Sequence, residues 1–196
     1  MSTERVETFS DGVFAIAITL LILIIQPPRS GAHLGHELLR LWPSYLAYAI
    51  SFLTVGIMWV NHHTIFRHFE RVDRPLLFLN IALLLLIAFV PFPTRVVAEF
   101  VRSDADRRAA ALLYGTTLTT TAVFFFAVWW YGSRRLLRAD ADRREVSGIT
   151  RSYLPGAPTY ALATALAFVN ATVSLIVFAA IAIFYALSSS LFGRNE

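Results

Sequence analysis

The chain has 196 residues, of which 57% are hydrophobic and only 15% are charged, and its mean hydropathy is +0.60. Soluble domains are typically about 45–50% apolar and about 25% charged, so this composition predicts a membrane protein. The absence of cysteine excludes disulfides, thiol nucleophiles and cysteine-ligated metals. All 17 basic residues are arginine, and they give the chain a pI of about 9.8. Because they cluster between apolar runs, we interpret them as residues that orient the chain in the membrane and not as a nucleic-acid binding surface.

The apolar stretches predict an all-α integral membrane protein with six transmembrane helices in one domain, because a spanning helix needs roughly 20 mostly apolar residues. The approximate helices are residues 4–26, 42–67, 75–100, 108–132, 152–169 and 171–190 of a single domain, residues 1–196. Pro91 and Pro93 mark the end of the most apolar part of the third helix. The last two helices come from one long apolar block, which we expect to turn near Asn170. Residues 132–151 are expected to form the one substantial polar loop.

The first apolar stretch has the position of a signal peptide but lacks its pattern. A signal peptide begins with basic residues and ends its apolar core at a small-residue cleavage site. Here Glu4, Glu7 and Asp11 precede the core, and the core ends in the sequence Gln26-Pro27-Pro28. We therefore expect this stretch to be retained as the first transmembrane helix.

The distribution of arginine predicts the orientation in the membrane. With the N-terminus inside, 11 of the 17 arginines fall at the N-terminus, in the second and fourth loops and at the C-terminus. The other 6 fall in the first and third loops, on the opposite side. Cytoplasmic loops carry the excess of basic residues, so both termini are predicted to be cytoplasmic.

Polar residues occur at one predicted depth in the first three helices, near the cytoplasmic end. At about 100° per residue, Trp59 and His62 share a face of the second helix with His63. Polar groups inside a membrane are costly and usually pair with one another. We therefore expect a hydrogen-bonded cluster that links three helices, with Arg5 nearby to neutralise its negative charge. The expected members are Ser10, Asp11, Trp59, His62, His63 and Asn80.

Three simpler interpretations compete with this cluster. Thr8–Asp11 fits a capping box, which would make Asp11 only a helix start. The adjacent histidines, His62 and His63, do not have the four-residue spacing that helical metal ligands usually have, so a metal site is not expected. A hydrolase is also not expected, because Ser10 lies in no nucleophile-elbow or oxyanion motif.

The segment Arg5–Asp11, RVETFSD, resembles the R-x-x-x-F-S-D signature of the endosomal and lysosomal potassium channel family and its bacterial homologues. The matching positions are Arg5, Phe9, Ser10 and Asp11. The resemblance continues through AIAITLLIL in the first helix, WVNHHTIF in the second, Asn80 in the third and the Pro91-Phe92 pair, so it covers about the first half of the chain. Bacterial members commonly have a glutamate where this chain has Ile24.

The resemblance implies a six-helix channel subunit that is not an enzyme and that forms a homotetramer in a bacterial cell (inner) membrane. The first helix of each subunit would line a central pore, with potassium ions as the permeant species and no cofactor. A structural network would brace that helix from behind: Arg5, Phe9, Ser10, Asp11, Trp59, His62, His63 and Asn80.

The first helix carries an apolar stripe that suits such a pore. Ile16, Leu20 and Leu23 project within about 60° of one another, with Thr19 at the border and Ser10 on the opposite side. No TVGYG-like filter occurs, so the family arrangement implies a hydrophobic constriction at Ile16, Leu20 and Leu23 and a role for Thr19 in ion selectivity. The expected function is a leak-type cation channel with modest selectivity for potassium.

Alternatives remain open at the level of sequence. Nearly the whole first helix is apolar, so periodicity alone does not decide which stripe faces a pore, and this stripe is also consistent with a surface that faces lipid or packs between helices. A proton-permeable or proton-coupled transporter is a second possible function, although its ionisable residues are expected near the midplane of the membrane. A membrane scaffold without transport is a third.

Overall fold

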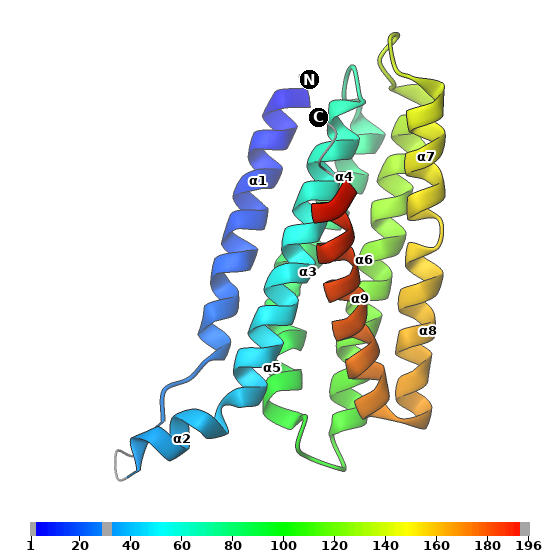
Figure 1. The fold of residues 1–196 in the computed structure, drawn as a ribbon. Coiled ribbons are helices and arrows are strands. Elements are labelled where there is room, and N and C mark those ends of the chain that lie inside the picture. The colour runs from blue at the N-terminus through cyan, green and yellow to red at the C-terminus, as the bar shows by residue number, and fades with distance from the viewer. Residues whose placement is uncertain (1–2, 29–32, 193–196) are drawn as a thin grey trace.

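The computed structural model describes residues 3–28 and 33–192, with side chains up to Leu187. Long helices pack side by side along one direction, and shorter helices lie at the ends of the bundle (Figure 1). The helices are α1 (Thr3–Leu20), α2 (Leu34–Arg40), α3 (Trp42–Arg67), α4 (Arg74–Phe89), α5 (Pro91–Phe100), α6 (Arg107–Arg135), α7 (Arg143–Tyr153), α8 (Gly156–Val169) and α9 (Ala171–Phe192). A short 3-10 turn, η1 (Leu21–Ile24), continues α1.

Four helical segments of the described chain are long and apolar enough to cross a membrane: Thr3–Ile24, Trp42–Arg67, Arg74–Phe100 and Arg107–Arg135. The helix α3 coincides with the predicted residues 42–67. The predicted helix 75–100 is divided into α4 and α5 at Val90. Pro91 causes this division because it has no backbone N–H to donate to the preceding turn.

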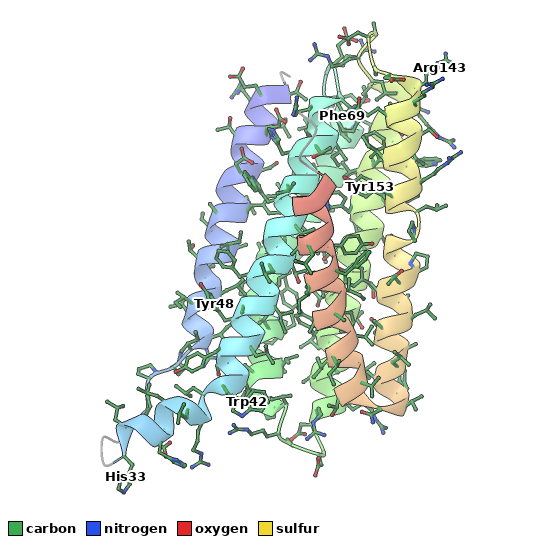
Figure 2. All side chains as sticks on the ribbon, in the orientation of Figure 1. His33, Trp42, Tyr48, Phe69, Arg143 and Tyr153 are labelled. Carbon is green, nitrogen blue, oxygen red and sulfur yellow. The ribbon has the colours of Figure 1, made fainter. Side chains whose placement is uncertain are left out.

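The fold alternates direction along the bundle. Figure 2 shows Phe69 and Arg143 near the end of the bundle where α1 begins, and His33 and Trp42 at the opposite end. The start of α1, the α3–α4 connection and the α6–α7 connection therefore share one end (Figure 1). The turn expected near Asn170 lies between α8 and α9, where the Asn170 side chain accepts hydrogen bonds from the backbone N–H groups of Thr172 and Val173.

The core lies between α6 and the helices around it. The helix α6 packs against α4, α5, α8 and α9, and α1 packs against α3 and α4. The largest fully buried side chains include Trp129 on α6, Phe14 on α1 and Phe66 on α3. The helix α1 is therefore held on one side by the bundle, whereas its other side is exposed among the described residues.

The structure differs from the sequence-based prediction in the region expected to be a polar loop, residues 132–151. The helix α6 continues to Arg135, and α7 occupies Arg143–Tyr153. Asp142 begins α7 by accepting a hydrogen bond from the backbone N–H of Arg144 at 2.8 Å. An amphipathic helix with several arginines has no long apolar run, and for that reason apolar length did not predict it.

The capping-box interpretation of Thr8–Asp11 is wrong. The helix α1 begins at Thr3, so Ser10 and Asp11 lie within it and not at its start. The hydroxyl of Thr8 donates to the carbonyl of Glu4 at 2.9 Å, as side chains inside a helix often do. The carboxylate of Asp11 therefore requires a different explanation, which lies in the contacts of α1 with α3.

Candidate functional site: the first helix and its polar cluster

The helix α1 has one buried face and one exposed face. The buried face carries Val6, Ser10, Phe14 and Ala17, and it packs against the bundle. The predicted pore residues lie on the other face, with exposed fractions of 61% for Ile16, 43% for Leu20 and 60% for Leu23. This division follows from the helical period of 3.6 residues, because residues three or four apart in sequence share a face.

A directional chain of hydrogen bonds joins α3, α4 and α1 on the buried face. The Nδ2 of Asn80 donates to the Oγ of Ser10 at 3.1 Å, and that hydroxyl donates to the carbonyl of Val6 at 2.7 Å. The Oδ1 of Asn80 lies 2.9 Å from the Nε2 of His62. An amide oxygen can only accept, so Nε2 carries the proton, and the Nδ1 of His62 has none while the ring is neutral.

The imidazole of His62 is packed as tightly as an apolar side chain. It stacks on Phe66 at 4.3 Å between ring centroids and contacts Phe14 edge-on at 5.4 Å. Its Nδ1 is buried and makes no hydrogen bond within the described part of the chain. A buried ring with one bonded nitrogen and two aromatic neighbours fixes the positions of three helices relative to one another.

Beside the buried hydrogen bonds of His62, Asn80 and Ser10, Asp11 and His63 form a second layer of less buried polar contacts between α1 and α3. The indole N–H of Trp59 donates to the Oδ1 of Asp11 at 2.8 Å. One turn away, the Nδ1 of His63 lies 3.9 Å from the Oε1 of Glu7. Sequence reasoning missed Glu7 as a member of this layer, although its position four residues before Asp11 places it on an adjacent part of the same face.

Arg5 and Phe9 do not join these contacts within the subunit. Both side chains are exposed, and neither makes a hydrogen bond, an ion pair or a ring contact with any described residue. The structure therefore brings together Ser10, Asp11, Trp59, His62 and Asn80 from the predicted network and pairs His63 with Glu7. Arg5 and Phe9 belong to the exposed face of α1.

Thr19 lies on the exposed face, and its hydroxyl is turned toward its own helix. Its Oγ1 is 2.9 Å from the carbonyl oxygens of both Ala15 and Ile16. The hydroxyl hydrogen is thus directed at the backbone, and the oxygen lone pairs remain able to accept from, or coordinate, a group on the exposed side.

The end of α1 tightens into η1, which affects two predicted positions. In a 3-10 turn the residues i and i+3 lie above one another, so Leu23 stays in line with Leu20. Ile24 is only 5% exposed, and η1 packs against α3 and α5. The side chain at position 24 therefore points into the bundle of this subunit and away from the stripe.

A second polar cluster, which the sequence did not indicate, lies toward the opposite end of the bundle. The Ser51 hydroxyl on α3 lies 2.9 Å from that of Thr94 on α5 and 3.2 Å from that of Tyr114 on α6. All three side chains are buried. Isolated hydroxyls in apolar helices give no pattern in the sequence, and only the packing of the three helices brings them together.

The helices and the buried polar cluster define an all-helical, multi-pass membrane protein. The sequence profile of the family described as the endosomal/lysosomal potassium channel TMEM175 matches residues 5–91. The chain is 43% identical, over 96% of its length and 95% of the relative's, to a potassium channel from Chamaesiphon minutus. It is also 43% identical to a potassium channel from Streptomyces collinus, over 92% of this chain and 90% of that one. This protein belongs to the TMEM175 family.

The fold agrees with a solved member of that family. The crystal structure of a lysosomal potassium-selective channel TMEM175 homologue from Chamaesiphon minutus superposes with a TM-score of 0.88 at 42% sequence identity. The match covers 95% of this chain and 97% of that one. The likeness therefore extends over the second half of the chain, where no motif had been recognised.

Proposed function

We propose that this protein is a potassium channel in which α1 from each of four identical subunits lines a central pore. The observation that carries the proposal is the exposed stripe of Ile16, Leu20 and Leu23 on a helix whose opposite face is fixed to the bundle by buried hydrogen bonds. One subunit cannot enclose a path with one helix face, but copies around an axis can. The two bacterial relatives named as potassium channels support the same function.

The chemistry of the pore follows from the side chains on the stripe. Rings of Ile16, Leu20 and Leu23 form a constriction that resists wetting, so ions pass only where it is wide enough to hold water. These rings extend over about 10–12 Å of the helix and its 3-10 turn. The lone pairs of Thr19 offer oxygen ligands without a fixed charge, which suits a weakly hydrated monovalent cation and gives modest selectivity for potassium.

In this proposal the subunit has six spans, with α8 and α9 as the fifth and sixth. The helix α8 has 14 residues and reaches about 21 Å, which is less than the hydrocarbon thickness of about 30 Å. The helix α7 continues it along the bundle toward the end where α1 begins (Figure 1). The excess of arginine at that end supports a cytoplasmic position for it in a bacterial cell, with both termini inside.

Potassium flux into liposomes tests the proposal. Leu23→Ala removes branched methyl groups from the constriction, and Ile16→Asn makes it polar, so both variants should raise potassium flux roughly tenfold by easing wetting. Leu85→Ala, on the exposed face of α4, is the matched control and should leave flux unchanged. Steady unitary currents in planar bilayers indicate a channel. Saturable proton-coupled flux indicates a carrier, and the absence of any ion flux indicates a scaffold; either of these two results rejects the proposal.

A further inference from the structure

The exposed stripe of α1 continues beyond the predicted constriction toward the N-terminus. At about 100° per residue, Phe9 projects within about 20° of Ile16, and Arg5 lies on the same side. The side chain of Phe9 is 61% exposed, the same fraction as that of Ile16. The signature residue Phe9 is therefore presented in the same direction as the proposed pore residues and not toward the polar cluster.

Gly12 separates Phe9 from Ile16 on this stripe. A Cβ added at Gly12 would meet nothing within 4 Å in the part of the subunit that the structure describes, so packing within that part does not explain this glycine. Phe9 and Ile16 are seven residues apart, which corresponds to about 10 Å along the helix. Around an axis, the Gly12 level would be wider than the levels above and below it, because it has no side chain.

Arg5 marks the end of the apolar stripe. It lies one turn before Phe9, it is exposed, and it makes no ion pair within the described part of the subunit. A guanidinium group is costly in the hydrocarbon of a membrane, so its presence on the stripe indicates that this end of the helix reaches the aqueous boundary. Phe9 is thus the first apolar side chain of the stripe that an ion would meet from the N-terminal end of the helix.

We propose that Phe9 from each subunit forms a second, aromatic constriction on the cytoplasmic side of the pore, with a wider water-filled level at Gly12 between it and Ile16. This inference rests on the proposed function, since it needs α1 to face a central axis. A permeating cation would pass two apolar rings in sequence. Four Phe9 rings would resist wetting as the aliphatic rings do, and they would also exclude cations larger than potassium by size.

Single-cysteine variants test the position of Phe9, because the chain has no native cysteine. In Phe9→Cys, oxidation with copper–phenanthroline should join subunits into disulfide-linked dimers, and silver ions, which bind thiolates, should lower potassium flux roughly tenfold by blocking the constriction. Phe168→Cys on α8, where the phenylalanine is 65% exposed, is the matched control and should show neither effect. The unmodified chain should be insensitive to both reagents.

The outcomes separate this inference from the proposed function. Inhibition at Ile16→Cys without inhibition or cross-linking at Phe9→Cys would overturn the aromatic constriction and leave the pore on α1 intact. Failure of both variants to respond would reject the pore itself. A further variant, Phe9→Ala, should raise potassium flux, whereas Phe168→Ala should not. Unchanged flux in Phe9→Ala would show that Phe9 does not narrow the path.

Discussion

At the scale of single residues, the buried chain from His62 through Asn80 to Ser10 holds α1 in place. Each member has its partner at 2.7–3.1 Å, and the direction of donation is fixed by the amide of Asn80. Sequence reasoning could place these residues at one depth, because polar residues in apolar helices are conspicuous. It could not predict that Arg5 and Phe9 lie outside the cluster, because that depends on which face of α1 meets α3.

The Asn80 amide gives a prediction at this scale. Asn80→Leu should lower the free energy of unfolding by about 1–3 kcal/mol, because it leaves the buried N–H of His62 without an acceptor. Adding His62→Phe removes that donor and keeps the ring between Phe14 and Phe66, so the double variant should be more stable than Asn80→Leu alone. Thermal unfolding of the purified proteins in detergent measures both. A double variant less stable than the single one would show that His62 has another essential partner.

At the scale of elements, apolar length located the long helices but not their ends. The bounds of α3 coincide with the prediction, whereas α6 extends past its apolar run and α7 was expected to be loop. The extension of α6 is held by contacts that are distant in sequence. Phe69 after α3 pairs with Leu137 after α6 in an isolated β-bridge, and the indole of Trp129 donates to the Thr150 hydroxyl on α7 at 2.9 Å.

Gly132 on α6 provides a test of the junction between the end of α6 and Phe69, which lies in the connection between α3 and α4. A Cβ at position 132 would collide with the ring of Phe69, which is buried and stacked on Trp129. Gly132→Ala must therefore move that ring, or the connection between α3 and α4 that carries it. We expect it to lower the free energy of unfolding by about 1–3 kcal/mol, the usual cost of overpacking. Gly148→Ala on α7 is the control, since a Cβ there meets no described atom within 4 Å. That change should be neutral or stabilise α7 by up to about 1 kcal/mol through helix propensity.

The readout for the glycine pair is the temperature at which each variant loses its monodisperse peak in fluorescence-detected size-exclusion chromatography. The midpoint for Gly132→Ala should fall below that of the unmodified protein, and the midpoint for Gly148→Ala should not. Equal midpoints for the two variants would mean that the Phe69 ring moves aside freely and that the junction does not hold the end of α6.

At the scale of the whole molecule, the subunit has two unlike sides. The α6 side is packed among α4, α5, α8 and α9, whereas α1 lies at the edge with its stripe uncovered. The sequence indicated the stripe but left open whether it faced lipid, because α1 is apolar almost all round. Among residues 3–28 and 33–187, the structure adds that α1 has one buried face and one exposed face, and the exposed face includes the proposed pore residues.

An uncovered stripe on an edge helix gives the last prediction, which concerns the number of subunits. Identical subunits that place the same helix at an axis form a closed ring, and four copies are expected from the family resemblance. Light scattering or native mass spectrometry of the detergent-solubilised protein should therefore give about four times the 22.0-kDa subunit mass. Ile16→Arg puts four like charges at the axis and should shift the population to smaller species, whereas Leu85→Arg on α4 should leave the mass unchanged. A monomeric unmodified protein that still conducts potassium would mean that the path lies within one subunit and not along α1.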